Sequence, residues 1–260
     1  MKKQFVVIGE RCEDVFIYGN AMRLSPEAPV PIFTPVNTIR SFGMAQNVYR
    51  NLKDISFNEC TDIHLYDYSS LQYATKTRYV DEKTNHYFLR VDECDHCYER
   101  FNVDDDMVAA LENADMVIIS DYNKGHLAVE DYKIISDYAA SALIVVDTKK
   151  ILSESIMKYV DYVKMNLTEY DKNYEALGYE FFERYEDMVI ITKGGDGAEY
   201  KDKFYPTEYV STIDVSGAGD TFLAAFAYMY SMTEDMDKAI PFANKMANIV
   251  VKKKGVSSIL

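Results

Sequence analysis

The feature that most constrains this chain is a regular alternation of helix-like and strand-like segments that begins near residue 104. The residue patterns predict helices over 104–113 and 129–140, and strands over 116–119 and 143–146. Short, continuous apolar runs of this kind are typical of strands that are buried on both faces. The alternation therefore predicts an α/β fold, with a mostly parallel central sheet and helices on both of its faces.

The bulk properties narrow the class of protein further. The chain has 260 residues, 48% of them hydrophobic, and we find no linker, so we predict one domain over residues 1–260. The formal net charge of −14 argues against nucleic acid and membrane surfaces as partners, because both are anionic. No apolar run reaches the roughly 18 residues of a membrane span. Because the apolar run near the N-terminus is also too short for a signal peptide, we expect a soluble, cytoplasmic protein.

A glycine-rich stretch directly precedes an apolar, helix-like run over residues 222–231. The stretch reads Asp214-Val215-Ser216-Gly217-Ala218-Gly219-Asp220-Thr221. Gly217 and Gly219 let a ligand approach the backbone closely, and free N–H groups at a helix start bind anions. Asp220 could then take a proton from an alcohol while those N–H groups hold phosphate charge. The layout suits phosphoryl transfer from a nucleotide to an alcohol, although a glycine-rich turn with an aspartate helix cap explains the pattern equally well.

This stretch resembles the signature of the ribokinase-like (PfkB) sugar kinases, Asp-Thr-x-Gly-Ala-Gly-Asp, with Val215 in place of the threonine. The resemblance implies a ribokinase-like α/β fold with a small β lid, and an enzyme that phosphorylates carbohydrates. It implies Asp220 as the catalytic base, and the backbone of Gly217, Ala218 and Gly219 as an anion hole. It also implies ATP and Mg²⁺ as the cofactors.

A proline-rich stretch near the N-terminus makes the resemblance more specific. Three prolines within residues 26–31 exclude a helix or a central strand and predict an extended edge or lid. The run Arg-x-Ser-Pro-Glu-Ala-Pro-Val-Pro at residues 23–31 resembles the D-glycero-β-D-manno-heptose 7-phosphate kinase domain of bacterial ADP-heptose synthesis proteins. That likeness implies a heptose 7-phosphate acceptor, phosphorylated at its anomeric hydroxyl. It also implies lid segments at about residues 12–40 and 74–92, and a homodimer formed through the lid.

Further matches to this family imply a sugar or sugar phosphate site. The residues concerned are Asp14, Gly43, Asn47, Lys76, Arg78, Asp121 and Lys124. For some of them an ordinary structural role stays open, since Asn47 could be a buried hydrogen-bonding group and Lys76 a solvated charge at a strand edge. The sequence departs from the family at two places. Met44 replaces a second glycine, and the chain is shortened between residues 51 and 70.

The second half of the chain carries the matches for the nucleotide. Asn166-Leu167-Thr168-Glu169 fits the family's Asn-x-x-Glu motif, which implies that Asn166 and Glu169 organise Mg²⁺ through water. The same three-residue spacing is that of a helix capping box. The resemblance also implies nucleotide contacts from a turn after a strand and from the last helix. These contacts come from Thr192, Lys193, Gly194, Gly197 and Asn244.

Three alternatives stay open at this point. Cys94 and Cys97 could hold a metal with a nearby histidine, form a redox pair, or be ordinary reduced thiols. The last alternative is favoured, because four cysteines in a chain of this length do not make a disulfide framework. The chain could be a ribokinase-like kinase for another sugar or a nucleoside. It could also be a binding module that keeps the fold without catalysis, although the intact signature argues against that.

Overall fold

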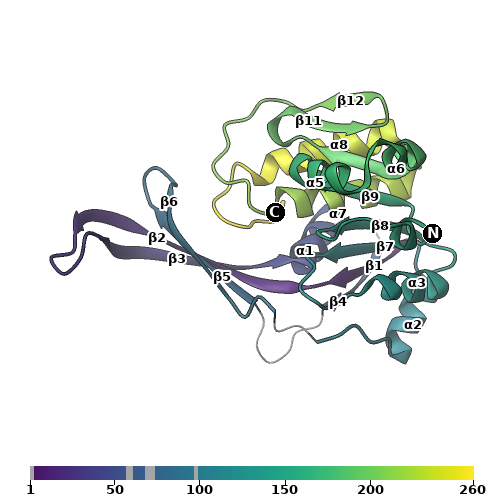
Figure 1. Cartoon of the computed structure of the whole chain (residues 1–260), viewed down its shortest axis with the longest axis horizontal. Helices are drawn as coiled ribbons and strands as arrows, with labels where there is room; N and C mark the ends of the chain where they lie inside the picture. The colour runs from purple at the N-terminus through teal and green to yellow at the C-terminus, as the bar shows by residue number, and fades with distance from the viewer. Residues whose placement is uncertain (1–2, 57–60, 68–73, 97–98) are drawn as a thin grey trace.

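The computed structural model describes residues 3–56, 61–67, 74–96 and 99–260. Its strands and helices form an α/β body and a separate, smaller β-sheet (Figure 1). In chain order the elements are β1 (Lys3–Gly9), β2 (Arg11–Leu24), β3 (Pro31–Met44), α1 (Ala45–Ile55), β4 (Thr61–Asp67), β5 (Ala74–Asp81), β6 (Tyr87–Glu93), α2 (Asp105–Glu112), β7 (Met116–Asp121), α3 (Val129–Tyr138), β8 (Leu143–Thr148), α4 (Glu154–Met157), β9 (Tyr162–Asn166), α5 (Leu167–Leu177), α6 (Tyr179–Arg184), β10 (Val189–Thr192), β11 (Gly197–Tyr200), β12 (Lys203–Pro206), α7 (Ala218–Thr233) and α8 (Met236–Val250).

The large sheet has the strand order β12-β11-β10-β9-β8-β7-β1-β4. The six strands β10, β9, β8, β7, β1 and β4 run parallel to one another, and β11 and β12 add an antiparallel edge. The carboxyl ends of β1, β7, β8, β9 and β10 therefore lie along one edge, which is where open α/β sheets bind ligands. The predicted α/β class with a mostly parallel sheet is confirmed.

Helices cover both faces of the large sheet, and the strand sequences explain why. In β1, Phe5 and Val7 pack with α1, α7 and α8, whereas Val6 and Ile8 pack with α2, α3 and α4 on the opposite face. Successive side chains of a strand point to opposite faces, so a strand covered on both sides must be apolar throughout. This is the continuous apolar pattern from which the fold class was predicted.

Helix α7 packs against both α1 and α8 and is apolar on nearly every side, as its sequence predicts. Phe222, Leu223 and Phe226 are almost completely buried. Burial of each such side chain contributes roughly 1.5–3 kcal/mol. The glycine-rich signature leads directly into this helix, so its first turn is attached to one of the most firmly packed elements of the body.

The small sheet has the order β3-β2-β5-β6 and projects from the body as a long ribbon (Figure 1). The hairpin expected between residues 75 and 92 is present as antiparallel β5 and β6. The segments predicted as a lid fall within this sheet, and the proline-rich residues 25–30 form the loop between β2 and β3. Across the described ranges, no helix is both long and apolar enough to cross a membrane.

Candidate active site

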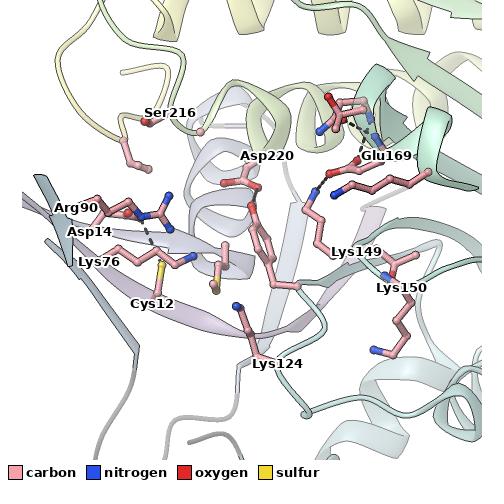
Figure 2. A pocket seen from close by; sticks show the side chains of 18 of the residues that line it. Cys12, Asp14, Lys76, Arg90, Lys124, Lys149, Lys150, Glu169, Ser216 and Asp220 are labelled. Carbon is pink, nitrogen blue, oxygen red and sulfur yellow. Dashed lines mark hydrogen bonds and ion pairs between the residues drawn. The ribbon is translucent and has the colours of Figure 1, made fainter. Parts of the chain in front are cut away.

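Two cavities meet at the first turn of α7. The first, of about 520 Å³, lies between the small sheet and the carboxyl ends of the large-sheet strands (Figure 2). The second, of about 480 Å³, lies between β9, the β10–β11 turn and helices α7 and α8. A few residues line both cavities and so mark their junction. They are Tyr122, Lys149, Asn166, Gly217 and Asp220.

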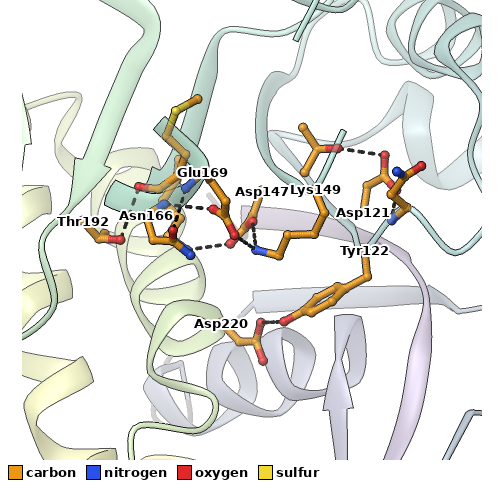
Figure 3. A network of polar contacts seen from close by, with 12 residues as sticks. Asp121, Tyr122, Asp147, Lys149, Asn166, Glu169, Thr192 and Asp220 are labelled. Atoms are coloured by element: carbon orange, nitrogen blue, oxygen red, sulfur yellow. Dashed lines mark hydrogen bonds and ion pairs between the residues drawn. The ribbon is translucent and has the colours of Figure 1, made fainter. Parts of the chain in front are cut away.

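Asp220 is held at this junction by two hydrogen bonds. The Tyr122 hydroxyl donates to Oδ1 at 2.9 Å (Figure 3). The Asn47 amide donates to Oδ2 at 3.0 Å. Burial raises the pKa of Asp220 to about 6, although both of these hydrogen bonds act to lower it. A carboxylate with that pKa is ionised at neutral pH and is a much better proton acceptor than an exposed aspartate.

Gly217 shapes the backbone just before Asp220. It is the N-cap of α7 and has φ of 84°, in the left-handed region that favours glycine. A Cβ atom there would also lie 2.7 Å from the Asn47 amide nitrogen, so a side chain would displace the group that holds Asp220. The N–H groups in the first turn of a helix have no partners within the helix, and this property lets a helix start attract anions. The N–H of Ala218 already donates to the Val215 carbonyl at 3.2 Å.

A buried network of charges lies on the β8–β9 side of Asp220. Lys164 donates to Asp147 Oδ2 at 2.6 Å. Lys149 donates to Asp147 Oδ1 at 2.9 Å (Figure 3). Lys149 also forms an ion pair with Glu169. Burial alone would raise the pKa of Asp147, but the two ammonium groups hold it at about 2. The two ammonium groups therefore keep the Asp147 carboxylate ionised beside the cavity junction.

Asn166 and Glu169 form the capping box that their spacing also suggested. Asn166 Oδ1 accepts from the Glu169 N–H, and Glu169 Oε2 accepts from the Asn166 N–H, both at 2.9 Å. The described residues contain no group of three or more acidic, histidine or cysteine side chains able to enclose a metal ion. One carboxylate and one amide oxygen are the kind of ligand that Mg²⁺ prefers, but Asn166 Oδ1 and both Glu169 oxygens already have partners, so Mg²⁺ bound mainly by nucleotide phosphates would reach them through water.

The small sheet supplies the other wall of the first cavity. Asp14 is buried and pairs with Arg78 at 2.5 Å. A Cβ atom on Gly43 would lie 2.1 Å from Asp14 Oδ2, so glycine is needed there to leave room for this carboxylate. Lys76 and Lys124 line the same cavity, from the small sheet and from the loop after β7 respectively (Figure 2).

Several predicted site residues do line one of the two cavities. Asp14, Lys76, Arg78 and Lys124 line the first, and Thr192, Gly194, Gly197 and Asn244 line the second.

Four predicted residues line neither cavity: Gly43, which leaves room for the Asp14 carboxylate, and three whose side chains lie elsewhere. Asn47 is completely buried, and its amide donates a hydrogen bond to Asp220. Asp121 is also completely buried, where it binds Tyr132, Thr148 and Lys150 behind the cavity wall. Lys193 pairs with Glu199 outside the second cavity. For Asn47, Asp121 and Lys193, the sequence pattern gave the position along the chain but could not give the direction of the side chain.

Sequence reasoning assigned no site role to Tyr122, Asp147, Lys149 or Lys164. One signal was present, because Lys164 is a charged residue inside the otherwise apolar run of β9. Lysine is almost never fully buried unless it is paired. Glu10 was also missed. Its carboxylate accepts from the N–H groups of Tyr122 at 2.7 Å and Lys124 at 3.0 Å, and so it fixes the loop after β7.

Two of the four cysteines, Cys12 and Cys94, lie in the part of the chain that the structure describes. Cys97 and Cys60 lie outside the described residues, and Cys94 is exposed. Cys12 is buried on the wall of the first cavity, where burial and the neighbouring Asp14 raise the pKa of its thiol. This thiol is therefore protonated and a poor nucleophile.

Comparison with known proteins agrees with this geometry. The fold is that of ribokinase. Ribokinase from Thermotoga maritima matches 98% of this chain and 95% of its own at a TM-score of 0.73 and 18% identity. A ribokinase-family nucleoside kinase from Methanocaldococcus jannaschii matches 99% of this chain and 94% of its own at a TM-score of 0.69 and 18% identity. Residues 72–260 match the sequence model of the pfkB family carbohydrate kinases, and the chain belongs to that family.

Curated relatives include the bifunctional protein HldE of Aeromonas hydrophila, 26% identical over 99% of this chain. The same protein of Helicobacter acinonychis is 27% identical over 97% of this chain. The chain spans 62% and 64% of the length of these two relatives. The family membership confirms the prediction of an enzyme, a carbohydrate kinase, over the alternative of a binding module that only keeps the fold.

Proposed function

We propose that this carbohydrate kinase transfers the γ-phosphoryl group of Mg-ATP to a hydroxyl of a sugar phosphate. The acceptor that we favour is a heptose 7-phosphate, phosphorylated at its anomeric hydroxyl, as the resemblance of residues 23–31 implies. The observation that carries the proposal is the position of Asp220 and Gly217 at the junction of the two cavities. An acceptor in the first cavity and a nucleotide in the second would meet there.

In this mechanism Asp220 removes the proton from the acceptor hydroxyl, with Tyr122 and Asn47 fixing its orientation. The hydroxyl oxygen forms the new bond to the γ-phosphorus as the bond to the bridging oxygen breaks, and ADP leaves with that electron pair. The first-turn N–H groups of α7 stabilise the charge on the transferred group. Mg²⁺, held through water near Asn166 and Glu169, would offset phosphate charge. Catalysis is mainly positioning and electrostatics.

The charge of the first cavity supports an acceptor with a phosphate of its own. Lys76 is buried on the cavity wall, and its ammonium lies 5.2 Å from the centre of the Tyr122 ring. Within the described part of the chain, it forms no ion pair with a carboxylate. A buried cation that no carboxylate contacts directly is costly, so it favours a ligand that brings negative charge. Lys124 and Arg90 lie on the same wall, where each is already in an ion pair, with Asp95 and Asp92 respectively.

A kinase for a different sugar is the second candidate, and Met44 favours it. This side chain lies on the wall of the first cavity where the heptose kinases have a glycine. Its φ of 60° with ψ of −137° is a backbone conformation normally reserved for glycine. The methionine therefore changes the shape of the acceptor site and could select another sugar.

The decisive experiment measures ADP release from Mg-ATP with a panel of acceptors. The panel contains heptose 7-phosphate, heptose without phosphate, fructose 6-phosphate, ribose and adenosine. Turnover of heptose 7-phosphate with little turnover of the unphosphorylated heptose is the expected result. Preference for ribose or adenosine would retain the kinase and reject the sugar phosphate. Failure to bind Mg-ATP would overturn the proposed mechanism.

We also propose that the chain forms a homodimer through the small sheet. Leu89 is 55% exposed and Phe88 42% exposed on β6, and Met22 is 83% exposed on β2. Exposed apolar side chains on a projecting sheet favour contact with a second copy. Leu89→Lys should convert a dimer into a monomer in sedimentation experiments. Ile134→Lys, at an exposed position of α3 on the body, is the matched control and should leave the dimer intact. A monomeric wild-type chain would contradict the proposal.

A further inference from the structure

Lys164 lies in a strand where its neighbours predict an apolar residue. In β9, Val163 and Met165 belong to the core on the α6 side of the sheet. Lys164 alternates with them, so it points to the opposite face, toward the start of α7. The lysine is 2% exposed, and it lines the second cavity. The Lys164 ammonium therefore lies in the wall of the proposed nucleotide site, inside the body rather than at its surface.

The ammonium group lies beside the first turn of α7. A Cβ atom built on Gly219 would be 3.0 Å from Lys164 Nζ, which places the ammonium against the glycine that opens the helix. The hydrogen bond to Asp147 uses one of the three donors of the ammonium. Lys164 therefore adds a full charge and further donors to the place where the backbone N–H groups form an anion site.

Stability alone does not explain this lysine. A buried ion pair contributes little net stability, because removal of two charges from water offsets their attraction, and an apolar pair of similar volume is often at least as stable. Elsewhere on this face of the sheet, the strands carry apolar residues such as Met116, Ile118 and Val145. Asp147 is moreover already paired with Lys149, so it does not require Lys164 for neutralisation.

We propose that Lys164 is a catalytic residue that binds the nucleotide phosphates at the first turn of α7 and stabilises the negative charge that develops during transfer. Asp147 is then a positioning residue that fixes the ammonium. As the bond from the γ-phosphorus to the bridging oxygen breaks, the electron pair moves onto the β-phosphate of ADP. Lys164 stabilises that charge, while the proton of the acceptor goes to Asp220. The inference rests on the proposed phosphoryl transfer and adds a residue to it.

The test compares wild type with Lys164→Met, which keeps the volume and removes the charge. We expect kcat to fall about 10²–10³-fold, the effect of losing one preorganised donor to a transition-state anion. Affinity for ADP with fluoroaluminate, which mimics the transferring phosphoryl group, should fall by a similar factor. Affinity for ADP alone should also fall, because the β-phosphate of ADP carries in full the charge that Lys164 is proposed to bind. Both affinities are measured by calorimetry and require no knowledge of the natural acceptor.

A double variant separates catalysis from folding. Lys164→Met leaves Asp147 with one cation fewer, so the single variant could lose stability. Lys164→Met with Asp147→Asn removes the pair together and should regain thermal stability. If Lys164 acts on the phosphates, the double variant stays defective in kcat and in fluoroaluminate affinity. Recovery of both in the double variant would overturn the inference, as would wild-type fluoroaluminate affinity in Lys164→Met. A wild-type chain that fails to bind ADP would instead reject the proposed function itself.

Discussion

The two walls of the site are built differently. On the body side, Asp220, Asp147 and Lys164 are buried, and each is held by hydrogen bonds to residues on other elements. On the small-sheet side, Asp14 and Arg78 form a similar buried pair, but Arg90 is half-exposed and the strands extend beyond the body (Figure 1). Under the proposed function, we expect phosphoryl transfer to depend on the body wall and acceptor choice to depend on the small sheet.

The largest effect should come from the body wall. Asp220→Asn removes the proposed base, and kcat should fall by up to about 10⁴-fold, the upper range for a general base. Binding of ATP, measured by calorimetry, should stay close to wild type because the asparagine keeps the shape of the junction. If Asp220→Asn retains substantial turnover, the assignment of Asp220 as the base is wrong.

A substitution in the small sheet should damage the acceptor site alone. In Gly43→Ala the new Cβ would force Asp14 to move, and displacement of about 1 Å can cost 10²-fold in kcat/KM. Gly19→Ala is the matched control, since its Cβ would meet the Thr34 carbonyl at 2.3 Å further along the same sheet. Both should lower thermal stability, and only Gly43→Ala should lower kcat/KM for the acceptor. Equal kinetic losses would show that the sheet acts as one unit.

Removal of the Lys76 charge should act on acceptor binding more than on kcat. A hydrogen bond to a charged group contributes roughly 1.5–3 kcal/mol, so Lys76→Met should raise KM for a phosphorylated acceptor about 10- to 100-fold. With the same sugar lacking its phosphate, the variant should resemble wild type. A rise in KM that is equal for both acceptors would place the phosphate elsewhere.

The smallest effect concerns pH. The pKa of Asp220 is about 6, and catalysis needs its ionised form, so kcat/KM should rise as the pH increases through that value and then level off. Tyr122→Phe removes a hydrogen bond that lowers this pKa. The acid limb of the profile should therefore move to higher pH in the variant. An unchanged limb would mean that another group controls it.

The sequence alone determined the α/β class and the position of the signature. Strands buried on both faces must be apolar throughout, and that requirement is visible in segments such as residues 116–119. The glycine-rich turn before an apolar helix likewise placed Asp220 at a helix start. These properties depend on local spacing, so they could be predicted without coordinates.

Only the tertiary structure decided which side chains face the site. Asn47, predicted to bind the sugar, donates a hydrogen bond to Asp220, because α1 packs beside α7. Lys164 and Asp147 come together because neighbouring parallel strands align them, although they are far apart in sequence. A motif fixes where a residue lies along the chain. The direction of its side chain and its partners depend on the packing of distant elements, and therefore only the folded chain reveals them.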